Sequence, residues 1–130
     1  MLREIITTTA APAAIGPYSQ AVRAGDFVYT AGQLGIDPAT GDLVEGLEAQ
    51  VEQILMNLAG ILEAAGSSLD NVIKTTCFLA DLADFKVFNA IYGSVFSAHR
   101  PARSTIQAAA LPAGALVEIE AIAHIGEGKR

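Results

Sequence analysis

The stretch LEAQVEQILMNLAGILEAA, residues 47–65, decides the fold because its apolar residues recur at three- and four-residue steps. This spacing places them along one stripe of an α-helix. Gly66 follows directly, and glycine is the residue that most often ends a helix. The stretch therefore predicts one long amphipathic helix, which must bury its apolar stripe against another element of the domain.

Three short β-rich segments precede this helix. Arg3–Thr7 is rich in β-branched residues, and two further runs, Tyr18–Arg23 and Phe27–Ala31, flank the tripeptide Ala24-Gly25-Asp26. Glycine between two β-rich runs is typical of a hairpin turn, because it adopts the left-handed backbone conformations that such turns need. We therefore expect three strands before the helix, with the second and third joined as a hairpin.

The segments after the helix predict three more strands and a second helix. Val72–Leu79 is apolar enough for a central strand. Asp84 then precedes a second stretch with an apolar stripe, and we expect it to cap a helix that Pro101 ends. The runs Arg103–Leu111 and Ala115–Ile125 surround a Pro-Ala-Gly turn. This arrangement favours a final antiparallel strand pair.

The resulting order is β-β-β-α-β-α-β-β over a single domain, residues 1–130. It predicts an α+β fold in which two helices pack on one face of a mixed β-sheet, leaving the other face open. Apolar residues make up 52% of the chain, yet no apolar run reaches the roughly 18 residues needed to cross a bilayer. We therefore expect no membrane association, and an oligomer in which a partner subunit covers the open face.

Charge and cysteine content argue against several classes of function. The chain carries 14 acidic and 8 basic residues without a cluster of lysines and arginines, so we expect no binding to nucleic acid. Cys77 is the only cysteine, which excludes an intrachain disulfide and a cysteine metal cluster. His99 and His124 lie far apart in sequence, so no metal site is expected. The N-terminal residues lack the apolar core of a signal peptide, which favours a cytoplasmic location.

Three charged residues interrupt the last two predicted strands. Arg103, Glu118 and Glu120 lie within otherwise apolar runs, and a buried charge is unfavourable unless something pairs with it. If the two strands pair around their turn, Thr105 lies opposite Glu120 and Gln107 lies opposite Glu118. All five side chains would then point to one face of the sheet. The charges either neutralise one another or await a ligand.

These residue types suit the binding and hydrolysis of a small carboxylate. Arg103 can hold a carboxylate through two parallel hydrogen bonds, and a glutamate nearby can orient or deprotonate a water molecule. Glu118 and Glu120 would lie roughly 7 Å apart along their strand, so the pKa of at least one should be raised unless Arg103 or a lysine offsets the effect. Neither role requires a metal or a cofactor. The pattern alone does not choose between the two glutamates.

Several separate motifs lie along the chain: Ile15-Gly16-Pro17-Tyr18-Ser19-Gln20-Ala21, Thr30-Ala31-Gly32-Gln33, Asp84-Phe85 with Asn89 and Tyr92, Pro101-Ala102-Arg103-Ser104, and Glu118-Ile119-Glu120. Together these motifs resemble the RidA (reactive intermediate deaminase A) family. The resemblance runs from about Ile15 to Ala123, which is nearly the whole chain.

The resemblance implies a fold, an assembly and an activity. The expected fold is chorismate-mutase-like, and the expected assembly is a homotrimer with its sites in the clefts between subunits. The implied reaction is the hydrolysis of 2-imino acids, released by pyridoxal-phosphate enzymes, to 2-oxo acids and ammonia. In this family Arg103 would bind the substrate carboxylate and Glu118 would position the attacking water. Tyr18, Gly32 and Asn89 match positions that line or shape the pocket.

Two positions depart from the pattern of many family members. Thr105, which we place among the substrate-binding residues, stands where many members carry cysteine, and Ala31 stands where some carry serine. A thiol nucleophile at residue 105 is therefore excluded. The main alternative is a non-catalytic, regulatory module of the same fold that binds small carboxylates. An endoribonuclease or translation inhibitor is a weaker alternative, because the chain is acidic.

Overall fold

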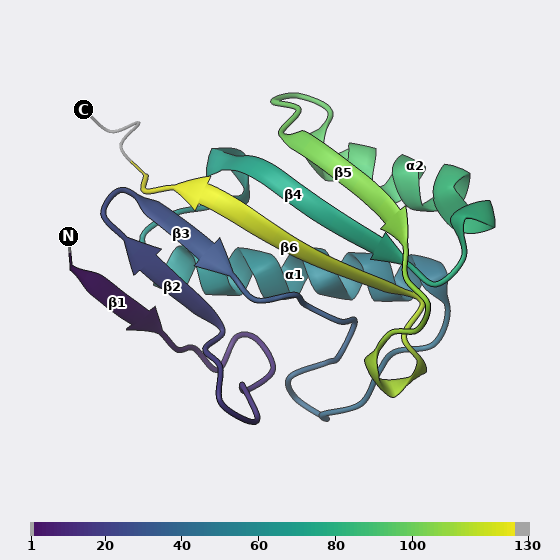
Figure 1. Cartoon of the computed structure of the whole chain (residues 1–130), viewed down its shortest axis with the longest axis horizontal. Coiled ribbons are helices and arrows are strands. Elements are labelled where there is room, and N and C mark those ends of the chain that lie inside the picture. Colours follow the sequence, from purple (N-terminus) through teal and green to yellow (C-terminus); the bar gives the residue numbers. More distant parts are fainter. Residues whose placement is uncertain (1, 127–130) are drawn as a thin grey trace.

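The computed structural model describes residues 2–126, which form a six-stranded sheet and two α-helices in the predicted order (Figure 1). The remaining positions of the predicted domain, 1 and 127–130, lie outside the described residues. The elements are β1 (Arg3–Ile6), β2 (Ala21–Ala24), β3 (Phe27–Thr30), α1 (Leu47–Ala64), β4 (Val72–Leu79), α2 (Phe85–Phe96), β5 (Ala102–Gln107) and β6 (Val117–His124). The spatial strand order is β1-β2-β3-β6-β4-β5, and only the β4–β5 pair is parallel.

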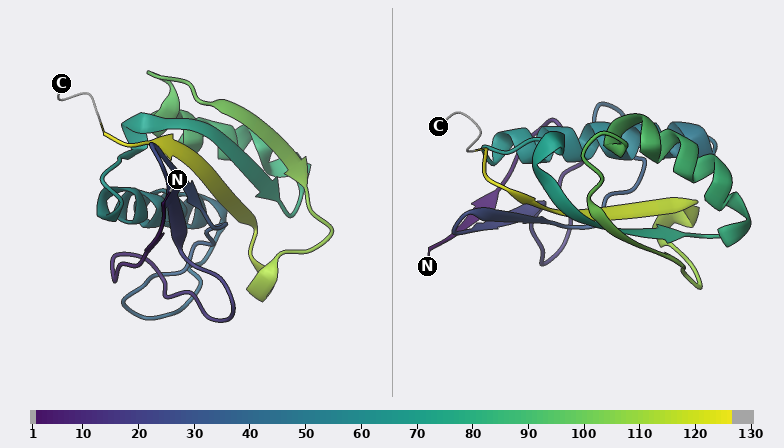
Figure 2. Two further views of the ribbon diagram at one scale, coloured as in Figure 1. Left: turned by 60° about the vertical axis from the view of Figure 1, so that its left-hand side comes forward. Right: turned by 90° about the horizontal axis from the view of Figure 1, so that it is seen from above.

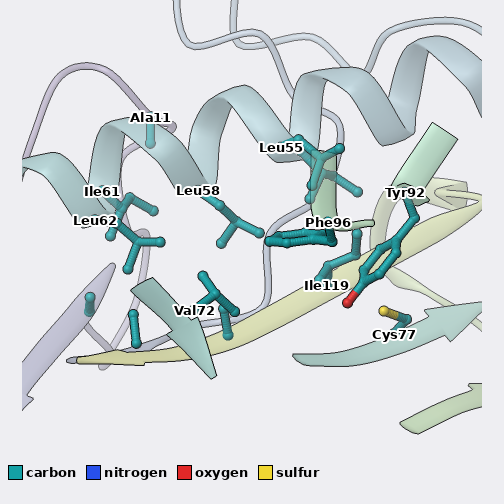
Figure 3. Close-up of a cluster of buried hydrophobic side chains, with 14 of the residues drawn as sticks. Ala11, Leu55, Leu58, Ile61, Leu62, Val72, Cys77, Tyr92, Phe96 and Ile119 are labelled. Atoms are coloured by element: carbon teal, nitrogen blue, oxygen red, sulfur yellow. The ribbon is translucent and has the colours of Figure 1, made fainter. Parts of the chain in front are cut away.

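Both helices cover the same face of the sheet, so the domain has two layers (Figure 2). The apolar stripe of α1 is buried as its spacing predicts, and Gly66 follows the helix with a φ of +86°. Strand β6 alternates between buried and less buried residues, because every second side chain faces the helices. Figure 3 shows part of this core, in which Leu55 and Leu58 of α1 approach Ile119 of β6 and Phe96 of α2.

The opposite face of the sheet, here called the open face, carries large apolar side chains. Ile5, Phe27, Tyr29 and Ile106 are between 40% and 60% exposed. The strand registers place these residues on the face that the helices do not cover. Exposed apolar side chains gathered on one face are typical of an interaction surface. No helix among residues 2–126 is long and apolar enough to cross a membrane.

The predicted antiparallel pairing of the last two strands is wrong. Strand β5 lies at the sheet edge and pairs in parallel with β4, whereas β6 lies between β3 and β4. The physical reason is α2, which carries the chain from β4 back to the start of a parallel neighbour. Residues 108–116 then cross the end of β4. The amide of Ala108 donates to the carbonyl of Leu79 at 2.9 Å, and the amide of Ala80 donates to the carbonyl of Leu116 at 3.0 Å.

The expected caps of α2 also need correction. The Asp84 side chain makes no capping hydrogen bond. Instead, Asp81 Oδ1 accepts a hydrogen bond from the amide of Ala83 at 2.9 Å, at the start of a short 3₁₀ turn that leads into the helix. At the other end, α2 ends at Phe96, before Pro101 is reached. A preceding 3₁₀ turn therefore moves the capping residue one turn earlier than the apolar stripe indicates.

Candidate active site

The strand registers separate the predicted site residues into two groups on opposite faces of the sheet. Arg103 lies opposite Thr75 in the β4–β5 ladder, and Thr75 is fully buried beneath the helices. Glu118 lies opposite Phe78 in the β4–β6 ladder. Opposed residues share a face, and side chains alternate between faces along β4, so Thr75 and Phe78 point to opposite sides. The expectation that Arg103 and Glu118 share a face is therefore wrong.

The guanidinium of Arg103 is held against three aromatic rings of α2. Its central carbon lies 4.7 Å from the ring centre of Tyr92, 5.3 Å from that of Phe85 and 6.0 Å from that of Phe88. The Nη1 group donates a hydrogen bond to Asn89 Oδ1 at 2.7 Å. These four residues lie on one side of α2, because they are spaced by three and four positions. The helix therefore positions the guanidinium through ring contacts and one hydrogen bond.

No carboxylate of residues 2–126 lies within ion-pairing distance of Arg103. The interpretation of Arg103 and the glutamates as a self-neutralising pair is thus wrong for a single chain. The rings lie close to the guanidinium, and Asn89 takes one of its five N–H donors. The remaining donors form a rigid fork whose shape matches a carboxylate. The arrangement can hold a small carboxylate in a fixed orientation.

Buried polar groups lie close to Arg103. Tyr92 Oη and Thr75 Oγ1 are hydrogen-bonded at 2.7 Å, and Cys77 Sγ is 3.9 Å from Thr75 Oγ1. Figure 3 shows the side chains of Tyr92 and Cys77 within this part of the core. Burial raises the pKa of the Cys77 thiol to about 11. At neutral pH this thiol is therefore protonated and unreactive. Thr105 Oγ1, on the residue paired with Cys77 in the ladder, is buried without a hydrogen-bond partner within residues 2–126.

A cleft of about 400 Å³ opens between α2 and β5. Its walls include Asn89, Tyr92 and Phe96 from α2, and Arg100, Pro101 and Arg103 from the segment that leads into β5. Arg103 and Asn89 thus face a space that a molecule of a few carbon atoms can enter. Asn89, Arg103 and Thr105 are here called the arginine half-site.

Gly32 lies directly beneath the carboxylate of Glu118. The amide and carbonyl of Gln33 exchange hydrogen bonds with those of Ile119, at 2.8 and 3.1 Å, and this bridge places Gly32 beside β6. A Cβ atom on Gly32 would overlap Glu118 Oε2. Position 32 must therefore be glycine if the carboxylate is to keep this position.

The environment of Glu118 favours its protonated form. Burial raises the pKa of the Glu118 carboxyl, and the nearby negative charge of Glu120 raises it further. The expectation that one of the two glutamates has a raised pKa is confirmed, with burial as the larger cause. A carboxylate with a raised pKa is a stronger base when it is ionised.

Tyr18 and Gly32 line a second cleft, of about 380 Å³. Tyr18 is 55% exposed, and its hydroxyl accepts a hydrogen bond from the amide of Ile15 at 3.4 Å. The loop before it is fixed by Gln20, to which we assigned no role. Its Oε1 accepts from the amide of Thr8 at 2.7 Å and its Nε2 donates to the carbonyl of Pro12 at 2.7 Å. The only signal for Gln20 in the sequence was its position in the motif that contains Tyr18. Tyr18, Gly32 and Glu118 are here called the glutamate half-site.

The structure thus brings the predicted residues together in two separate sets. The arginine half-site lies on the helix-covered face at the sheet edge, and the glutamate half-site includes the open face of β6. Ala31, next to Gly32, donates its amide hydrogen bond to the carbonyl of Gln20 at 2.9 Å. Within residues 2–126, no three histidine, cysteine, aspartate or glutamate side chains gather in a way that could hold a metal ion.

Comparison with known proteins identifies the family. The model of the family described as Endoribonuclease L-PSP matches residues 8–125. The chain is 52% identical over 127 residues to the mouse protein 2-iminobutanoate/2-iminopropanoate deaminase, covering 97% of this chain and 94% of that protein. It is 53% identical over 124 residues to the chloroplastic Reactive Intermediate Deaminase A of Arabidopsis thaliana, covering 95% of this chain and 66% of the plant protein's length.

A solved structure agrees with the predicted fold. The crystal structure of E. coli TdcF with bound serine superimposes with a TM-score of 0.88 at 43% identity, covering 93% of this chain and 98% of that one. The predicted chorismate-mutase-like α+β fold is therefore confirmed. From these matches, the chain belongs to the Endoribonuclease L-PSP family, which includes the RidA deaminases.

Proposed function

We propose that the chain hydrolyses small 2-imino carboxylic acids to 2-oxo acids and ammonia, as a homotrimer whose active sites lie between subunits. One observation carries the proposal. The guanidinium of Arg103 is oriented by α2 and faces a cleft, yet no carboxylate of residues 2–126 pairs with it. The name of the mouse relative, 2-iminobutanoate/2-iminopropanoate deaminase, supports the choice of imines as substrates. The bound serine in TdcF supports a small ligand that carries a carboxylate.

A site between subunits follows from the opposite placement of the two half-sites. Each has half of the required chemistry, because Arg103 can bind a carboxylate and Glu118 can activate water. In a cyclic oligomer, one subunit can present its arginine half-site to the glutamate half-site of the next, and the contact repeats until the ring closes. The exposed apolar residues of the open face would be buried in that assembly.

The proposed reaction begins with the substrate carboxylate on Arg103, while Asn89 holds the guanidinium in place. Glu118 of the neighbouring copy accepts a proton from water as the water oxygen bonds to the imine carbon. The electron pair of the C=N bond moves to nitrogen, which gives a tetrahedral carbinolamine. Glu118 returns its proton to the nitrogen, and the hydroxyl proton then passes to the nitrogen through the same carboxylate. As the C–N bond breaks, its electron pair leaves with ammonia, and an oxygen lone pair forms the C=O bond of the 2-oxo acid.

The remaining site residues shape the pocket in this scheme. Gly32 leaves room for the Glu118 carboxylate, and Tyr18 forms part of the adjacent wall. The hydroxyl of Thr105 is buried and has no hydrogen-bond partner within residues 2–126, so a polar ligand group that reached it would complete its hydrogen bonding. Cys77 takes no part, because burial keeps its thiol protonated. None of these roles uses a metal or a cofactor.

The raised pKa of Glu118 favours an enzyme over a module that only binds carboxylates. Binding alone needs Arg103, whereas a desolvated carboxylate with a like charge beside it is unfavourable and suits a base. A ribonuclease is disfavoured, because a net charge of −6 repels the phosphate backbone. We place the protein in the reducing cytoplasm, since its one cysteine is buried and forms no disulfide.

The activity can be measured with a dehydratase that converts serine to the imine of pyruvate. At a fixed amount of dehydratase, adding this protein should make pyruvate appear faster than spontaneous hydrolysis allows. The control omits the protein, and light scattering checks that the trimer is intact. An intact trimer that gives no acceleration would leave the non-catalytic, carboxylate-binding module as the better account.

Mixed oligomers test where the site is formed. Arg103→Ala and Glu118→Gln chains are each expected to be inactive, and the two are unfolded, mixed in equal amounts and refolded together. If each site takes Arg103 from one subunit and Glu118 from the next, about one quarter of the sites regain both groups. A site built within one chain predicts no recovery in the same mixture.

A further inference from the structure

We propose that the cleft between α2 and β5 binds substrates with a second carboxylate, with Arg103 holding the carboxylate next to the imine and Arg100 holding the other. The inference rests on the proposed function and names its substrate class, the 2-imino dicarboxylic acids of four or five carbon atoms. It assigns a specificity role to Arg100, a residue to which the motifs gave none.

The charged residues that line the cleft are both positive. Two of the five arginines of the chain line this one cleft, and neither aspartate nor glutamate lines it. The whole chain has a net charge of −6, so this positive cleft is a local exception. A site for a substrate with one carboxylate needs one guanidinium. Two guanidinium groups facing the same space match a ligand with two anionic groups.

The backbone at Arg100 has a conformation that is unusual for arginine. Its φ is +48°, in the left-handed region that favours glycine, and its amide donates to the carbonyl of Phe96 at 2.8 Å after the helix ends. Arginine therefore occupies a position whose conformation is better suited to glycine. Backbone strain of this kind is often retained for the function of a side chain.

Arg100 and Arg103 are close enough for both guanidinium groups to bind one small ligand. Arg100 and Arg103 are three residues apart, so their Cα atoms are separated by at most about 11 Å. Arg100 Nε donates to the carbonyl of Ser97 at 3.2 Å, and this bond anchors the side chain near the cleft while its two terminal nitrogens stay available. A cleft of about 400 Å³ can accommodate a five-carbon diacid between the two groups.

The test compares the binding of two stable 2-oxo acids by calorimetry, 2-oxoglutarate with two carboxylates and 2-oxobutanoate with one. Arg100→Gly removes the guanidinium and suits the local φ, so its Tm should not fall. The matched control is Lys86→Ala, which removes one positive charge from α2 outside the cleft. We expect Arg100→Gly to shift the ratio of the two dissociation constants about tenfold against 2-oxoglutarate, and Lys86→Ala to leave the ratio unchanged.

An unchanged ratio in Arg100→Gly, or an equal shift in Lys86→Ala, would overturn the inference. Because the probes are not turned over, this result is independent of the proposed deaminase activity. If imine hydrolysis fails while the ratio shifts, the cleft is a dicarboxylate-binding site without turnover. If hydrolysis of the pyruvate imine is accelerated while the ratio stays constant, the proposed function stands and Arg100 has no role in specificity.

Discussion

The arginine half-site and the glutamate half-site differ in the contacts that surround their charged groups. Arg103 is held by three nearby aromatic rings and by a hydrogen bond to Asn89, so its position is set within one chain. Among the residues that the structure describes, none holds the Glu118 carboxylate in a comparable way. It lies over Gly32, partly buried, and the charge of Glu120 adds to the effect of burial.

This difference indicates which part of the reaction each half-site serves. A guanidinium that is already oriented binds without reorganisation, as recognition of a carboxylate requires. Protonation of a poorly solvated carboxylate is energetically more favourable than protonation of a well solvated one, as the role of a base requires. The two half-sites thus separate binding from proton transfer, and substitutions in each should affect different kinetic parameters.

Substitution of Arg103 should have the largest effect. Loss of two charge-assisted hydrogen bonds at about 1.5–3 kcal/mol each predicts a fall of about 10³-fold in kcat/KM for Arg103→Ala. Arg103→Lys keeps the charge but loses the fork, so it should recover only part of that loss. Steady-state rates on the pyruvate imine measure both, with light scattering as the check on assembly. Full activity in Arg103→Lys would mean that the charge alone suffices.

Glu118→Gln should lower kcat by about 10²-fold while it stabilises the fold. Glutamine can still orient a water molecule but cannot take its proton. We therefore expect a loss at the smaller end of the range for removal of a general base. In the wild type, the raised pKa predicts that kcat/KM increases as the pH rises through the pKa of Glu118. A pH profile of kcat/KM without this step would exclude Glu118 as the base.

The stability of the same variant depends on pH in a defined direction. Because burial raises the pKa of Glu118, its protonated form favours folding, and this contribution is fully present below the unfolded pKa and lost as the pH rises through the folded pKa. At pH 7 the free energy of unfolding of Glu118→Gln should therefore exceed that of the wild type by less than about 1 kcal/mol after solvent screening, and its Tm should be higher. Below about pH 4 the difference should vanish. Thermal melts at both pH values measure it.

The parts of the fold that depend on neighbouring residues could be predicted from the sequence. The stripe of α1 and the turn at Gly25, whose φ is +62°, are set by spacing and by local backbone preference. The position of β6 was not predictable in this way, because the pairing of a strand depends on contacts with residues that are distant in sequence. Residues 112–114 look like a hairpin turn, yet they belong to a loop that crosses the end of β4.

The same limit explains the error about the site. The residue types of Arg103 and Glu118 indicated a carboxylate-binding group and a base. Two observations agree with these roles: Arg103 has no carboxylate partner within residues 2–126, and the pKa of Glu118 is raised. Their relative placement depended on the pairing of β5 and β6, which β4 separates. A strand–helix–strand pattern over Val72–Gln107 was the available signal for a parallel β4–β5 pair.

Gly32→Ala should have the smallest effect and should act through the glutamate half-site alone. The φ of Gly32 lies outside the left-handed region, so alanine fits the backbone, but its Cβ would displace the Glu118 carboxylate. We expect kcat to fall about tenfold, as for other small displacements of a catalytic group. The dissociation constant for 2-oxobutanoate should change much less than kcat, because Arg103 sets it.

A double-mutant cycle isolates this effect. If Gly32 acts only by leaving room for the Glu118 carboxylate, adding Gly32→Ala to Glu118→Gln should lower kcat by much less than tenfold. The two residues then contribute to one function, and their separate losses do not add. Additive losses would mean that Gly32 serves the substrate directly. In that case the glutamate half-site would contribute to binding as well as to proton transfer.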